Sequence, residues 1–244
     1  MAGHSKWANI KHRKAAQDAK KGKVFTKLIR ELTVAARNGS ADPSENPRLR
    51  TAIDKALGAN MKRDTVDKAI ARGAGGGNDE QLDELVYEGY GPNGVAILIE
   101  CMTDNVNRTV ANVRAAFTKA GGNLGTNGSV AYLFESRGVM TFEGAEEEVL
   151  FEAAIDAGAQ DVVAHDDGVI EVVTAPEDFH AVMDALASQG YRSSHAELDR
   201  VASTEVELDE ESGAKIVRLI DVLEDLDDAQ NVYHNAIIPE SCYS

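Results

Sequence analysis

Apolar side chains recur at helical spacing in the first third of the chain. Between Lys23 and Arg37 they lie three and four positions apart, as one buried stripe requires: Phe25, Leu28, Ile29, Leu32 and Ala36. At about 100° per residue, the basic residues of this segment fall together on the opposite face: Lys23, Lys27, Arg30 and Arg37. The pattern predicts an amphipathic helix with a basic outer face.

Two more helices are predicted before residue 77. Asn46-Pro47 combines a capping residue with proline at the first helical position, and the helix should end near Gly58. Another should begin near Asp64 and end at Arg72-Gly73, where glycine suits a left-handed cap. Upstream, residues 8–20 have few large apolar side chains, so we expect a basic arm that is at most partly helical. The first 77 residues therefore predict a small helical bundle with a basic extension.

A glycine-rich segment, residues 73–79, follows the bundle. It lacks the Gly-Lys-Ser/Thr ending of a phosphate-binding loop and does not join a strand to a helix. The segment is therefore interpreted as a flexible linker.

Beyond the linker, the spacing of apolar residues changes from that of helices to that of strands. Val86–Tyr90 and Val95–Met102 have the pattern of strands, and Gly91-Pro92-Asn93-Gly94 between them predicts a turn. Asn107 is a candidate cap for a helix that ends at Gly121-Gly122, and Ser129–Phe134 is a candidate strand. This segment predicts the order ββαβ.

A complete βαββαβ unit comes next. The predicted elements are a strand at 138–142, a helix at 146–157, strands at 161–165 and 169–174, a helix at 177–189 and a strand at 195–201. Asp167-Gly168 predicts the hairpin turn between the two central strands. This order is typical of the ferredoxin-like, split βαβ arrangement.

One helix (214–226) and one strand (231–238) remain after that unit. Since the ββαβ segment lacks a helix and a strand, we expect residues 205–244 to return and complete it. The prediction is an α+β fold with three domains: residues 1–77, residues 78–135 together with 205–244, and an inserted ferredoxin-like domain at 136–204.

Charge divides at the glycine run and indicates the function class. Residues 1–75 hold 17 Lys and Arg against 7 Asp and Glu, a formal balance of +10, whereas the remainder holds 8 against 34, or −26. Such asymmetry is typical of a polyanion-binding module carried by an acidic body. No apolar run approaches a membrane span, and no signal-peptide pattern is found, so a cytoplasmic protein is expected.

The basic segment is the predicted nucleic-acid-binding site, since Lys and Arg attract phosphate whatever the base sequence. Trp7, the single tryptophan, could stack on an unpaired base. The alternative is that Trp7 packs on the bundle and the cations form a solvated face or contact the acidic body. The predicted site comprises His4, Lys6, Trp7, Lys11, His12, Arg13, Lys14, Lys20, Lys21, Lys23, Lys27 and Arg30, with a second, weaker cluster of Arg48, Arg50, Lys62, Arg63 and Arg72.

Several long strings resemble one protein family, YebC. They are the opening MAGHSKWANIKHRKAAQDAKKGKVFTKLIREL, then NPRLRTAIDKALGANMKRDTVDKAIARG, YEGYGPNGVAILIEC, DNVNRTVANVRAAFTKAGGNLGTNGSVAYLF and VYHNAI. The family extends from bacterial proteins to a mitochondrial translational activator of cytochrome oxidase. The resemblance implies a helical domain followed by two α/β domains and a role in gene expression. It implies a transcriptional regulator that binds DNA through the basic domain, or alternatively a translation factor that binds ribosomal RNA.

The residues themselves do not decide between DNA and RNA. No recognition-helix motif stands out, and an arm with an aromatic residue suits unstacked bases in structured RNA. The acidic body would also repel a duplex laid broadly along it. The expected partners are nucleic acid and, in the translational alternative, the ribosome, with no membrane and no small-molecule substrate.

Two rival classes remain. His165-Asp166-Asp167 could act in acid–base chemistry, but Asp167-Gly168 is better explained as a hairpin tip. No histidines lie at metal-ligand spacing, and no nucleophile motif appears, so neither enzyme, metal nor cofactor is predicted. A protein-interaction adaptor is the other rival, because the C-terminal segment is strongly acidic; a solvated face is the favoured explanation of that segment.

Overall fold

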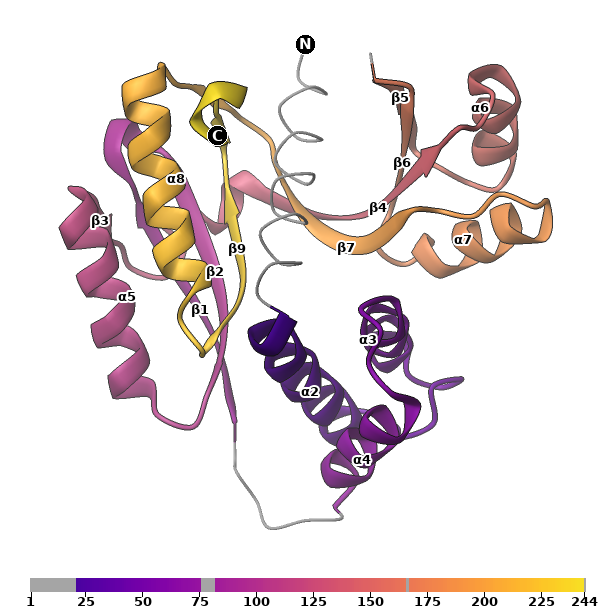
Figure 1. Ribbon diagram of the computed structural model, residues 1–244, viewed down its shortest axis with the longest axis horizontal. Coiled ribbons are helices and arrows are strands. Elements are labelled where there is room, and N and C mark those ends of the chain that lie inside the picture. The colour runs from indigo at the N-terminus through magenta and orange to yellow at the C-terminus, as the bar shows by residue number, and fades with distance from the viewer. Residues whose placement is uncertain (1–20, 76–81, 166, 244) are drawn as a thin grey trace. The chain divides into compact units, whose positions relative to one another are not determined.

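The computed structural model describes residues 21–75, 82–165 and 167–243, and for Lys21 the backbone alone. Chain contacts divide the described residues into two compact units. One comprises residues 132–204, and the other residues 21–131 together with 205–243. The predicted arm at 8–20 and most of the predicted linker lie outside the described residues. Most helices and strands of the two units are labelled in Figure 1.

Three helices open the larger unit: α2 (Lys21–Asn38), α3 (Pro47–Gly58) and α4 (Arg63–Gly73). The predicted stripe of α2 packs against α3 and α4 in a core that includes Leu32, Leu49 and Val66. The Asn46 side chain caps α3, because its Oδ1 accepts a hydrogen bond from Leu49 N at 3.0 Å. The helical bundle therefore forms where the apolar spacing and the capping residue predict it.

A four-stranded antiparallel sheet follows in the same unit, in the order β3-β1-β2-β9. Its strands are β1 (Asp83–Tyr90), β2 (Ala96–Thr103), β3 (Asn123–Leu124) and β9 (Ala229–His234). Helices α5 (Val106–Ala120) and α8 (Glu210–Glu224) pack together on one face (Figure 1), around Ile97, Ile99, Phe117 and Leu219. The apolar run of β2 is thus buried by elements that are distant in sequence.

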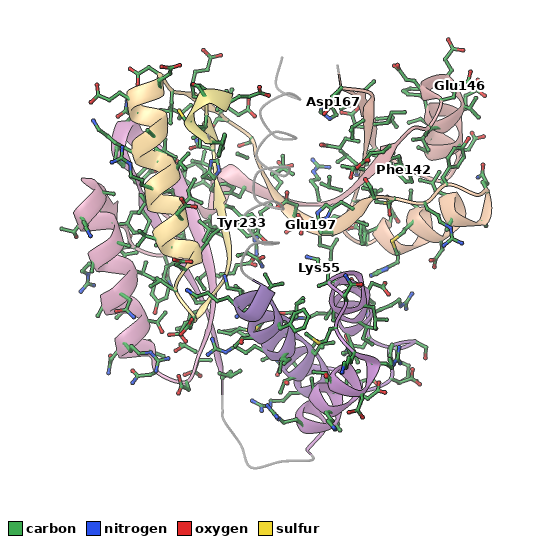
Figure 2. All side chains as sticks on the ribbon, in the orientation of Figure 1. Lys55, Phe142, Glu146, Asp167, Glu197 and Tyr233 are labelled. Carbon is green, nitrogen blue, oxygen red and sulfur yellow. The ribbon has the colours of Figure 1, made fainter. Side chains whose placement is uncertain are left out.

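The C-terminal segment is built into this sheet. Tyr233, labelled in Figure 2, lies on β9, and its hydroxyl donates to Glu100 Oε2 of β2 at 3.3 Å. Beyond it, β10 (Ala236–Ile237) pairs in parallel with β8 (Val206–Glu207). The sheet that begins at residue 83 is therefore completed by residues after 205.

A buried carboxylate organises the loop after β3. Glu88, 5% exposed, accepts backbone hydrogen bonds from Gly128, Val130 and Ala131, each at 2.7 Å. Burial raises the pKa of Glu88, but the three backbone donors outweigh it and hold the pKa below its usual value. The Glu88 carboxylate, on strand β1, therefore holds this loop against the sheet.

The smaller unit is ferredoxin-like. Its elements are β4 (Phe134–Glu143), α6 (Glu147–Asp156), β5 (Asp161–Ala164), β6 (Val169–Thr174), α7 (Phe179–Ser188) and β7 (His195–Ala202). The antiparallel order is β5-β6-β4-β7, as the split βαβ prediction requires. Met140 and Phe142 lie in the core with residues of the two helices. Phe142 is labelled in Figure 2. Gly168, at φ +81°, makes the predicted hairpin turn.

Several local predictions were wrong. Gly73 does not form a left-handed cap, because it lies within α4 and the residue that ends the helix is Ala74, at φ −72°. Residues 131–133 form a 3₁₀ turn, and the strand begins only at Phe134. Helix α5 is capped by Asn105, whose side chain accepts from Arg108 N, and not by Asn107. Helix α8 begins at Glu210, four residues before the predicted start, because Asp209 caps it through Ser212 N at 2.8 Å.

The three-domain division stays a prediction. Strand β9 does return to β2, but chain contacts place the helical bundle and this sheet in one unit. Among the described helices, none has the length and apolar character needed to cross a membrane.

Candidate nucleic-acid interface

Helix α2 makes contacts through two of its faces. One is the stripe that forms the bundle core, and the other bears Lys23, Lys27, Arg30, Val34 and Asn38 at steps of three and four residues. Val34 is 1% exposed although it lies outside the bundle core, so this second face is covered at its centre. The predicted basic face therefore turns away from the bundle, as expected, but part of it is buried.

The end of α8 receives the first two cations. Lys23 Nζ donates to the Asp225 carbonyl oxygen at 3.0 Å and lies 3.5 Å from the Asp225 carboxylate. Lys27 Nζ donates to the Glu224 carbonyl oxygen at 2.9 Å. These carbonyls belong to the C-terminal end of a helix, which carries partial negative charge and favours cations. Lys23 therefore pairs with a carboxylate and a carbonyl oxygen, and Lys27 with a carbonyl oxygen.

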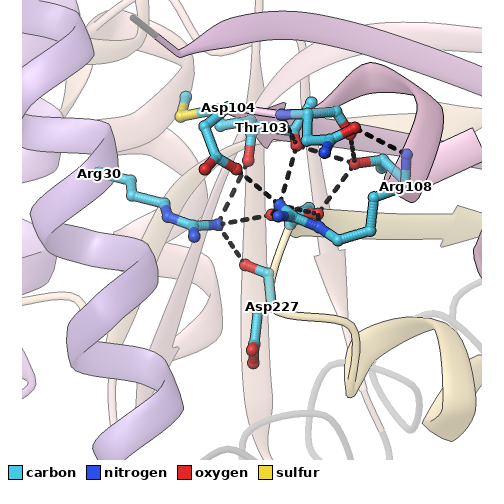
Figure 3. A network of polar contacts seen from close by, with 9 residues as sticks. Arg30, Thr103, Asp104, Arg108 and Asp227 are labelled. Carbon is cyan, nitrogen blue, oxygen red and sulfur yellow. Dashed lines mark hydrogen bonds and ion pairs between the residues drawn. The ribbon is translucent and has the colours of Figure 1, made fainter. Parts of the chain in front are cut away.

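Arg30 enters a polar network around Asp228 (Figure 3). Its guanidinium donates to the Met102 and Asp227 carbonyl oxygens and to Asp228 Oδ1 at 3.3 Å. Asp228 is 5% exposed and also accepts from Arg108. A buried carboxylate needs such partners, because removing a charge from water is costly. Arg30 thus helps to neutralise a buried acid.

The rest of the Asp228 network comes from the start of α5. Arg108 Nη2 lies 2.9 Å from Asp228 Oδ2 and 2.6 Å from Asp104 Oδ1. Thr109 Oγ1 donates to the same Asp228 oxygen at 2.9 Å, and lies 2.8 Å from Thr103 Oγ1. The network therefore joins α2, α5 and the residue just before β9.

The weaker cluster of predicted cations does not gather at one place. Arg48 pairs with Glu31 and Glu84 at 2.7 Å each; burial lowers its pKa, but the two carboxylates outweigh it and raise the pKa. Arg50 donates to the Pro43 and Ser44 carbonyl oxygens. These two arginines stabilise the bundle and its contact with β1.

The cations of α4 are more accessible. Lys62, Arg63 and Arg72 are exposed, and Arg63 forms a surface ion pair with Asp67 at 3.0 Å. Exposed pairs of this kind contribute little and are readily exchanged. Together with Lys23, these three are the exposed residues of the predicted site among those whose side chains are described.

The remaining predicted residues lie outside the described side chains. They are His4, Lys6, Trp7, Lys11, His12, Arg13, Lys14, Lys20 and Lys21.

Sequence reasoning did not identify Asp228 as the partner of Arg30, or Arg108 as the second cation that Asp228 binds. The residues are 120 positions apart, and their types alone do not distinguish a buried acid from the solvated charges around it. No local signal in the sequence marks Asp228 as buried, because charged residues beside a strand are usually solvated.

The rival chemistry finds little support in the described part of the chain. His165 is 7% exposed with Nε2 3.7 Å from Glu171 Oε2, next to the hairpin turn. Burial raises the pKa of Cys101 to about 12, which is unsuited to a nucleophilic thiolate. Within residues 21–75, 82–165 and 167–243, no group of three or more His, Cys, Asp or Glu is placed to hold a metal ion.

Comparison with known proteins places this architecture in a family. A family model described as "TACO1/YebC protein N-terminal domain" matches residues 5–76, and one described as "TACO1/YebC second and third domain" matches residues 82–236. A "Probable transcriptional regulatory protein" of Aeromonas salmonicida is 62% identical over 240 residues, covering 98% of both chains. A protein of the same name from Hahella chejuensis is 64% identical over 241 residues, covering 98% of this chain and 97% of the relative.

A solved structure shares the fold. The crystal structure of a conserved hypothetical protein from Aquifex aeolicus superposes with a TM-score of 0.81 at 44% identity, covering 91% of this chain and 92% of that one. Because the two family models together span nearly the whole sequence and the relatives match end to end, this chain belongs to the TACO1/YebC family.

Proposed function

We propose that this protein is a non-enzymatic regulator of gene expression that binds nucleic acid through residues 1–77. The observation that carries the proposal is the charge division, +10 in the first 75 residues against −26 in the rest. A basic module attracts phosphate and gains free energy from counterion release, whereas the acidic remainder repels it. The relatives named as transcriptional regulatory proteins favour DNA as the ligand and transcription as the process regulated.

Structured RNA is the second candidate, and one observation favours it. The cations of α2, the longest basic helix described, are turned toward other parts of the same unit rather than presented as a recognition helix. An arm bearing a single tryptophan suits unstacked bases better than a closed duplex. Under this alternative the protein acts in translation on ribosomal RNA.

The test removes charge from the arm within the full chain. Substituting Lys6, Lys11, Arg13 and Lys14 by Gln should weaken binding to labelled duplex DNA or to a labelled RNA stem-loop, measured by fluorescence polarisation. The log-affinity versus log-salt slope should shrink by up to about one per lost phosphate contact. The matched control replaces four exposed cations elsewhere by Gln: Arg114, Lys119, Arg192 and Arg218.

Equal loss in the two variants would contradict the proposal, because the effect would then be one of net charge alone. Crosslinking in cells followed by sequencing of the attached nucleic acid decides between the ligands. Clustered promoter DNA supports transcription, and ribosomal RNA supports translation.

A further inference from the structure

The α8–β9 turn, residues 224–228, presents carbonyl and carboxylate oxygens to the basic face of α2. Three of its carbonyl oxygens accept from that face, from residues 224, 225 and 227. The carboxylates of Asp225 and Asp228 lie 3.5 and 3.3 Å from the cations of Lys23 and Arg30. Oxygen acceptors with negative charge are also what a phosphate backbone offers to lysine and arginine.

The contacts differ in strength along the helix. Lys23 and Asp225 are 45% and 48% exposed, so their pairing is screened by salt and easily exchanged. Arg30 and Asp228 are only 21% and 6% exposed, and Asp228 is held further by Arg108 and Thr109. The outer end of the contact can therefore open while the inner end persists.

We infer that the α8–β9 turn is an intramolecular competitor for nucleic acid, occupying Lys23 and Lys27 until a phosphate backbone displaces it. Arg30 remains bound to Asp228 as the anchor of the closed arrangement. The inference rests on the proposed function, in that the ligand is a nucleic acid. It adds that, in the protein without ligand, the α8–β9 turn covers part of the basic face of α2.

Competition has a measurable signature in salt dependence. When phosphate displaces the Asp225 carboxylate from Lys23, the freed carboxylate attracts a cation from solution and offsets part of the counterion release from the nucleic acid. Removing that carboxylate beforehand should therefore make binding both tighter and more steeply dependent on salt.

The experiment uses the full chain carrying Asp225→Asn and Asp227→Asn, two exposed positions on the turn, so that no new cation is introduced. Its matched control carries Glu152→Gln and Asp184→Asn, exposed helical positions in the other compact unit with the same change of charge. The probes are a labelled RNA stem-loop and a labelled DNA duplex. We expect the turn variant to bind about threefold more tightly than the control, with a salt slope steeper by up to about one, because the Asp225 carboxylate no longer competes for Lys23. Equal affinity and slope in turn variant and control would overturn the inference.

A second measurement needs no nucleic acid. Amine-reactive labelling followed by mass spectrometry reports how accessible the Lys23 amine is. Its reactivity should rise in the turn variant, which lacks the Asp225 carboxylate, and stay at the wild-type level in the control. Unchanged Lys23 reactivity in the turn variant would overturn the inference even if the arm substitutions abolished binding. A different pair of results would separate the two ideas. If Lys23 reactivity rises in the turn variant but the arm substitutions leave binding intact, the proposed function is refuted and the closed contact stands.

Discussion

Single buried charges set much of the architecture at the residue scale. Asp228 and Glu88 are each 5% exposed, yet one is satisfied by side chains from two helices and the other by three backbone donors. Their sequence neighbourhoods gave no sign of burial, since charged residues are usually solvated. Local pattern is therefore a poor guide to these two positions.

Removing the Asp228 carboxylate should destabilise the larger unit. Asp228→Ala leaves the buried Thr109 hydroxyl without this acceptor and deprives Arg30 and Arg108 of their shared partner, so we expect a loss of about 2 kcal/mol or more. Chemical denaturation measures the change. Asp104→Ala is the control, because the Asp104 side chain is 51% exposed and its ion pair with Arg108 lies at the surface. Its free energy of unfolding should stay close to that of the wild type.

Glu88 should make stability depend on acid pH. Its pKa is lowered in the folded state, so its contribution is present above the ordinary value of 4.5 and is lost as the pH falls through the folded-state pKa. Glu88→Gln offers one acceptor oxygen in place of two and should cost about 1–3 kcal/mol at neutral pH. Thermal unfolding of both proteins as a function of pH provides the measurement. The difference between them should shrink below pH 4.5, and a constant difference across the titration would contradict this account.

Elements were predictable where short-range chemistry determines them. The segment Pro47–Gly58 forms a helix with the expected ends, because a capping side chain and proline fix its start. The start of α8 was missed because Ser212 and Gly213 interrupt the apolar spacing. Gly213 is needed there for packing, since a Cβ would lie 2.8 Å from Cys242 Sγ. That reason comes from a residue 29 positions away, beyond the reach of local pattern.

Close approach of α2 and α4 depends on another glycine. A Cβ at Gly73 would overlap the Thr33 carbonyl oxygen and lie 2.9 Å from Ala36 Cβ. Gly73→Ala should therefore cost about 1–3 kcal/mol, since the helices must separate. Gly58→Ala, at the end of α3 where nothing lies within 4 Å, should change stability by no more than about 1 kcal/mol. Comparing the two thermal unfolding midpoints tests the contact, and equal midpoints would count against it.

The whole molecule combines a basic segment with an acidic remainder, and this division was visible in the sequence. The candidate site was only partly predictable. Helical spacing correctly placed Lys23, Lys27 and Arg30 opposite the bundle core, but it could not reveal the carbonyl and carboxylate partners nearly 200 residues away. Reversing these three charges would therefore disturb the α8–β9 turn, and cannot be read as a change in ligand binding alone.

The return of the chain to its first sheet is testable by cutting it. A protease site inserted between Ser203 and Thr204, both exposed and outside the strands, should be cleaved in the native protein. The 204–244 piece should remain bound, because β9 pairs with β2 and α8 packs against α5. Co-elution of the pieces in native gel filtration, and their separation in denaturant, is the expected result. Loss of the C-terminal piece under native conditions would show that the pairing is too weak to hold it.

The pairing of β2 with β9 also imposes an order on folding during synthesis. The ribosome releases β1 and β2 early, but the strand that covers the edge of β2 is among the last segments to emerge. Residues 134–202, in contrast, contain every strand of their own sheet and can close as soon as they leave the exit tunnel. The edge of β2 therefore stays uncovered in the nascent chain while residues 134–202 fold. A truncated product that ends before residue 229 would lack β9 and keep this apolar edge open to aggregation.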